Sequence, residues 1–157
     1  MKNNDILRRL RYALDLSDVK MVAIFKCSDY DIDVLKIKDM LKKEDEEGFL
    51  NVNDRIMTLF LDGFIIFKRG ENPKKSDEPI KKEKKLSNND ILKKLKIALN
   101  MKSDDLMELF ELAENPISKS ELSAVLRNKD HKNFKECGDK YIKKILQGLT
   151  IKNRGTK

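Results

Sequence analysis

The chain contains one sequence twice, and this duplication constrains its fold more than any other feature. A shift of 85 residues places residues 3–70 on residues 88–155 without a gap, and 19 of the 68 aligned positions are identical. Both copies open with NNDIL and close with Arg-Gly. Self-similarity of this kind indicates one small structural unit that occurs twice. We therefore expect a first helical repeat over residues 1–70, a linker over 71–86 and a second helical repeat over 87–157.

Each copy carries a helical hydrophobic pattern in four segments. Apolar residues recur at i, i+3 and i+4 within them, which is typical of amphipathic helices. The pattern predicts helices over 5–14, 18–28 and 33–43 and from residue 54, and over 90–99, 104–113 and 119–128 and from residue 139. The Asn residues that precede the first helix, with Asp5 or Asp90, are expected to accept hydrogen bonds from its first turn. The sequence therefore predicts an all-α chain of two homologous four-helix repeats, related by pseudo-symmetry and joined by a linker that contains Lys and Pro.

Gly63 and Gly148 occupy the same aligned position inside the fourth predicted helix. Glycine in a helix interior costs about 0.5–1 kcal/mol relative to alanine. Its presence in both copies therefore indicates a compensating requirement. We favour close packing of two helices, and the alternative is a ligand that approaches the bare backbone.

The sequence offers no recognisable catalytic or metal-binding pattern. His131 is the only histidine, so a catalytic triad or a site with several histidines is excluded. The spacing of Asp29, Asp31 and Asp33 resembles the start of a calcium loop, but the glycine and the bidentate glutamate that such a loop needs are absent. We expect no enzymatic activity, no cofactor and no metal.

The two cysteines and the lengths of the apolar runs indicate in which cellular compartment the protein is expected. Cys27 and Cys137 do not align between the copies and fit reduced thiols of a cytoplasmic protein better than a disulfide framework. No apolar run is long enough to span a bilayer, and the first residues lead directly into an amphipathic pattern rather than a signal peptide. We expect a cytoplasmic protein that does not contact a membrane.

The net charge of +7 is unevenly distributed along the chain. Residues 1–67 carry −2, residues 68–86 carry +4 and residues 87–157 carry +5. A phosphate-binding face would therefore belong to the second copy. Its candidate residues are Lys132, Lys135, Lys140, Lys143, Lys144, Lys152 and Arg154. The alternative is ordinary solvated charge on helix surfaces.

The second and third predicted helices have the spacing of a helix-turn-helix unit. A recognition helix should offer basic or amide side chains at its start. The first copy offers Asp31 and Asp33 there, whereas the second offers Ser118, Lys119 and Ser120. The spacing is common to short helical pairs and does not by itself predict DNA binding.

The two copies differ one-sidedly in polarity. Seven positions are apolar in the first copy and polar in the second: Val19, Ala23, Val34, Leu35, Leu59, Ile65 and Phe67, which align with Asp104, Glu108, Lys119, Ser120, Lys144, Thr150 and Lys152. Equal modules facing water equally should not diverge in this way. We expect these seven residues to form an interface, covered by the linker, by the second copy or by a second chain, and we favour a homodimer through the first repeat. The alternative is a larger internal core in the first copy.

Several strings of the chain resemble one bacterial family. The paired NNDIL openings, LKKEDEEGF at residues 41–49, FLDGFIIFKRG at 60–70 and HKNFKECGD at 131–139 are similar to the YehS-like family, which is catalogued as domain of unknown function 1456. The resemblance covers nearly the whole chain. It implies a bacterial, cytosolic protein with two copies of the domain, and it brings no catalytic or binding residues.

Together these observations favour a non-enzymatic binding or regulatory module that acts through protein–protein contacts with an unknown partner. Nucleic-acid binding through the basic second repeat is the alternative.

Overall fold

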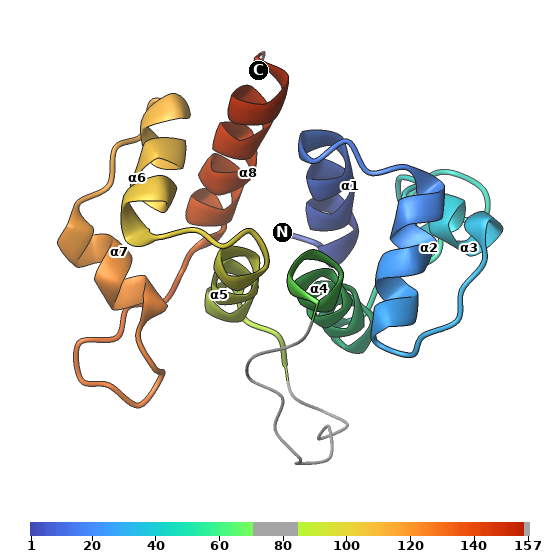
Figure 1. Ribbon diagram of the computed structural model, residues 1–157, viewed down its shortest axis with the longest axis horizontal. Coiled ribbons are helices and arrows are strands. Elements are labelled where there is room, and N and C mark those ends of the chain that lie inside the picture. Colours follow the sequence, from blue (N-terminus) through green and yellow to red (C-terminus); the bar gives the residue numbers. More distant parts are fainter. Residues whose placement is uncertain (71–84, 156–157) are drawn as a thin grey trace. The chain divides into compact units, whose positions relative to one another are not determined.

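The computed structural model describes residues 1–70 and 85–155. The predicted linker falls largely on residues 71–84, outside the described part of the chain. The described residues form helices and connecting loops, with no strand among them. In chain order the helices are α1 (Asn3–Ala13), α2 (Asp18–Cys27), α3 (Val34–Met40), α4 (Asp54–Arg69), α5 (Asn88–Ala98), α6 (Ser103–Leu112), α7 (Lys119–Leu126) and α8 (Asp139–Arg154) (Figure 1).

The chain divides into two compact units. The first comprises Met1–Arg11 and Asp15–Leu86, and the second comprises Tyr12–Leu14 and Ser87–Lys157. Four helices occur in the same order in each repeat, and each has nearly the same length as its counterpart. This confirms the predicted all-α fold with two four-helix repeats.

The core of the first unit lies between α2 and α4. Phe25 of α2 meets Phe60 of α4 with ring centroids 5.4 Å apart, and Phe60 stacks on Phe64 one turn later. All three rings are buried. In the second unit α6 and α8 pack in the same way, and Phe110 makes an edge contact with Tyr141 at 6.0 Å. Apolar burial at these helix pairs is the main source of stability that each small unit has.

Gly63 and Gly148 are the points where these helix pairs touch, as the sequence predicted. A Cβ added to Gly63 would lie 2.1 Å from the backbone oxygen of Ile24, and one added to Gly148 would lie 2.2 Å from that of Leu109. Both distances are far below van der Waals contact, and the obstructing atoms belong to the backbone. Glycine is therefore required in both repeats for α4 to approach α2 and for α8 to approach α6.

One buried asparagine in each repeat ties its helices together. The side-chain amide of Asn4 donates to the backbone oxygens of Met40 and Leu50 at 2.9 Å each, and its oxygen accepts from the N–H of Val52 at 2.9 Å. Asn89 makes the same three bonds in the second repeat, to Val125, Lys135 and Cys137. The predicted capping role of these asparagines was wrong, because they lie inside α1 and α5 and tie those helices to the loop that precedes the fourth helix.

Candidate functional site

The seven apolar positions of the first repeat have different environments. Val19 and Leu35 are 71% and 70% exposed, and Phe67 is 40% exposed. Ala23 is also exposed, whereas Val34 and Leu59 are half-buried. Ile65 is only 2% exposed. It therefore offers no surface to a second chain, and the exposed members of the candidate interface are Val19, Ala23, Leu35 and Phe67.

Three of these four residues belong to one stretch of surface across α2 and α4. Ser28 Oγ donates to the backbone oxygen of Leu59 at 2.7 Å, and Gly63 abuts Ile24. The contacts therefore move toward the start of α2 as the chain moves toward the end of α4. The next turn of α4 brings Phe67 toward the exposed side of α2 where Ala23 lies.

A charged pair at the aligned positions of the second repeat supports this placement. Lys152 aligns with Phe67 and Glu108 aligns with Ala23. Lys152 Nζ and Glu108 Oε2 form an ion pair at 3.6 Å. An exposed pair of this kind contributes at most about 1 kcal/mol. At these aligned positions the second repeat thus carries an ion pair, whereas the first repeat carries two apolar side chains.

The seven candidate phosphate-binding residues of the second repeat are exposed, except that Lys144 is half-buried. Several of them are engaged with neighbours. Lys135 donates to Tyr141 Oη at 2.9 Å and lies 3.9 Å from Glu121, and the hydrogen bond to Tyr141 raises the pKa of Lys135. Acidic side chains therefore interrupt the lysine-rich surface. They make its electrostatic potential less positive, which weakens its attraction for a phosphate backbone.

In the two candidate helix-turn-helix units, α3 and α7 would be the recognition helices. The residues at which these helices start have structural roles. Asp33 accepts a hydrogen bond from the N–H of Lys36 at 2.9 Å and so caps α3. Ser118 caps α7 in the same way through the N–H of Glu121 at 3.0 Å. These caps account for Asp33 and Ser118 without a nucleic acid.

The candidate metal-binding and thiol residues of the described chain have the following environments. Among residues 1–70 and 85–155, no three His, Cys, Asp or Glu side chains are grouped to hold a metal ion. Cys137 is buried, and this burial, together with the charge of Asp139, raises the pKa of its thiol to about 12. His131 is exposed, and its Nδ1 accepts a hydrogen bond from the N–H of Asn133 at 3.1 Å. The thiol is protonated at neutral pH and is not a nucleophile there.

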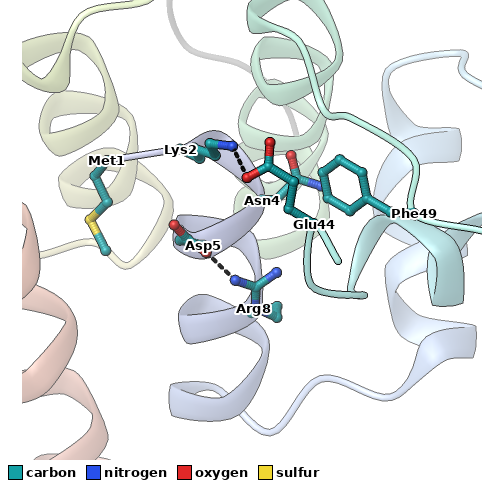
Figure 2. Close-up of a pocket in the computed structure, with 7 residues that line it drawn as sticks. All are labelled: Met1, Lys2, Asn4, Asp5, Arg8, Glu44 and Phe49. Atoms are coloured by element: carbon teal, nitrogen blue, oxygen red, sulfur yellow. Dashed lines mark hydrogen bonds and ion pairs between the residues drawn. The ribbon is translucent and has the colours of Figure 1, made fainter. Parts of the chain in front are cut away.

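A hollow of about 400 Å³ lies beside the start of α1 (Figure 2). It is lined by Met1, Lys2, Asn4, Asp5, Arg8, Glu44 and Phe49. Lys2 pairs with Glu44, and Arg8 pairs with Asp5 and donates to the backbone oxygen of Lys42 at 2.8 Å. The charges around the hollow thus neutralise one another and fasten α1 to the loop after α3.

Comparison with known proteins places both repeats in one family. The model of the family described as "Protein of unknown function (DUF1456)" matches residues 3–70 and again residues 88–155. The chain belongs to this family. It is also 38% identical over 152 residues to the "Uncharacterized protein YehS" of Escherichia coli K12. This alignment covers 97% of this chain and 96% of the relative. No solved structure matches the chain significantly.

The two DUF1456 matches coincide with the repeats as the sequence divides them. They begin at Asn3 and Asn88 and end at Gly70 and Gly155. The paired positions that the structure explains, the buried asparagines and the contact glycines, lie within both matched segments. These shared residues of the two copies therefore have structural roles. No helix in the described part of the chain is both long and apolar enough to cross a membrane.

Proposed function

We propose that this DUF1456 protein is a non-enzymatic binding module that acts through protein–protein contacts made by its first repeat. The observation that carries this proposal is the exposure of Val19, Leu35 and Phe67 at positions where the second repeat has Asp104, Ser120 and Lys152. Exposed apolar side chains that form a contiguous patch mark contact surfaces. Their polar counterparts in the second repeat support this interpretation, because the same backbone folds without them.

Affinity capture from the native cell tests this proposal, with the wild-type chain and a triple variant as matched baits. The variant Val19→Asp, Leu35→Ser, Phe67→Lys installs the residues of the second repeat on the first. We expect a protein that the wild type retains after nuclease treatment and that the triple variant loses. Equal recovery on both baits would contradict a role for this surface.

Nucleic-acid binding through the second repeat is the second candidate, and the exposed Lys140 and Lys143 on α8 favour it. If it is correct, RNA or DNA should bind at low salt, and replacement of Lys140, Lys143 and Lys144 by Gln should flatten the dependence of log Kd on log salt. A titration without binding at low salt would remove this candidate.

A further inference from the structure

The outward side of α2 has an uncommon composition for a solvent-exposed helix face. It consists of Val19, Lys20, Ala23 and Lys26, all exposed, and we call these four residues the α2 outer face. The opposite side of the helix carries the buried Met21, Ile24 and Phe25. Val19 and Ala23 are one helical turn apart, so they form a continuous apolar strip that the two lysines flank.

The same face of α6 has the opposite character. The residues that align with the α2 outer face are Asp104, Asp105, Glu108 and Glu111, all acidic. Asp105 accepts a hydrogen bond from the N–H of Lys102 at 2.8 Å. Asp104, Glu108 and Glu111 are exposed. Two helices at equivalent places in homologous repeats thus carry outer faces of opposite character.

We propose that the α2 outer face, extended by Phe67, is a docking site for an acidic amphipathic helix of another protein. This proposal rests on the proposed function and specifies the chemistry of the partner. Apolar residues spaced three and four apart on the incoming helix would contact Val19, Ala23 and Phe67. Its flanking carboxylates would pair with Lys20 and Lys26, which provides charge complementarity and orientation.

The charges near this surface favour an acidic partner. Asp18, at the start of the same helix, lies 3.9 Å from Arg11 and is partly neutralised by it. Lys20 and Lys26 are the charged residues of the α2 outer face itself. An acidic helix gains from both lysines, whereas a basic or neutral helix does not.

A second copy of the chain fits this surface less well. Two α2 outer faces brought together would set lysines near lysines, and like charges in an interface are unfavourable. A stable dimer also buries about 800 Å² on each partner, which is far more than three side chains expose. A single docked helix needs only a short strip of apolar contacts.

Peptide selection on the full chain tests the proposal directly. A random library of displayed peptides of about 14 residues, roughly four helical turns, is panned on the immobilised wild type. The matched control is an α2 swap, Val19→Asp, Lys20→Asp, Ala23→Glu, Lys26→Glu, which gives α2 the outer face of α6. Circular dichroism and the melting temperature establish that the swap is folded.

We expect the selected peptides to be acidic, with apolar residues three and four apart. Their affinity, measured by fluorescence anisotropy, should fall at least tenfold in the α2 swap and should also weaken as salt rises. The proposal is overturned if no peptide is enriched, if the enriched peptides are basic or neutral, or if they bind the α2 swap as tightly as the wild type.

Two further outcomes separate this proposal from the proposed function. If selection fails while native capture still depends on Leu35 and Phe67, the acidic helix is wrong and the contact function stands. If capture is also insensitive to these residues, both fail. A wild type that sediments as a dimer, with a monomeric α2 swap, would identify a second copy as the occupant and overturn the acidic-helix proposal.

Discussion

Replacing either contact glycine by alanine should destabilise its unit, although alanine is the better helix former. In an open helix the change would stabilise by about 0.5–1 kcal/mol. At Gly63 the new Cβ would lie 2.1 Å from Ile24 O and 3.0 Å from Ile24 C, and at Gly148 it would lie 2.2 Å from Leu109 O. A normal van der Waals contact between a carbon and an oxygen atom is roughly 1 Å longer than these Cβ–O distances, so the two helices must move apart.

The cost of this movement outweighs the gain in helix propensity. Overpacking in a well-packed core costs about 1–3 kcal/mol, and obstruction by backbone rather than by a flexible side chain favours the upper part of that range. We therefore expect Gly63→Ala and Gly148→Ala each to lose about 1–2 kcal/mol net. A loss of this size lowers the melting temperature of a domain of 60–100 residues by about 4–16 °C.

Urea unfolding followed by circular dichroism measures these losses. Gly138→Ala is the control, because its Cβ would meet nothing within 4 Å, and it should cost less than about 1 kcal/mol through the N-cap of α8. An alanine at residue 63 or 148 that leaves the chain as stable as the wild type, or makes it more stable, would refute the close-contact account.

Two further predictions concern buried groups. Asn4→Ala and Asn89→Ala should each cost about 2–4 kcal/mol in urea unfolding, since three hydrogen bonds are lost and buried backbone groups are left unpaired; a loss below about 0.5 kcal/mol would show that the backbone finds other partners. Cys137, whose pKa burial raises to about 12, stays protonated at pH 8, so Ellman's reagent should modify it slowly in the native chain and fast in denaturant. Native labelling of both thiols at equal rates, with Cys27 as the internal reference, would contradict this burial.

The repetition in the sequence was enough to predict most of the fold. Alignment of the copies gave four helices in each, and the observed starts of α4 and α8 at Asp54 and Asp139 agree with the prediction. The glycine contact was also predictable, because an unfavourable residue recurs at one position. Local periodicity and comparison of the two copies carry this information without any three-dimensional data.

Other features depend on contacts that local patterns do not contain. Asn4 was assigned to a cap, yet its partners lie 36 to 48 residues away. The third helix was predicted to reach residue 43 but ends at Met40, where the following loop returns and Leu50 N–H binds Asp39 O at 3.1 Å. Ile65 has the same apolar chemistry as Phe67, and only the packed structure separates the buried residue from the exposed one.

The candidate surface was only partly predictable. Polarity differences between the copies identified Val19, Ala23 and Phe67, but they did not reveal that these residues share one surface. The ion pair between Glu108 and Lys152 supports a common surface for the two positions aligned with Ala23 and Phe67. This pair could have been found in the sequence. A search would look for two oppositely charged residues of one copy that both align with apolar residues of the other copy.

Transplanting the α2 outer face onto the second repeat tests the central claim most directly. The variant Asp104→Val, Asp105→Lys, Glu108→Ala, Glu111→Lys, with Lys152→Phe, gives α6 and α8 the surface of the first repeat. Isothermal titration calorimetry with a selected acidic peptide should then find two sites per chain, against one in the wild type and none in the α2 swap. A folded transplant that still binds one peptide per chain would contradict the claim that this surface is sufficient for docking.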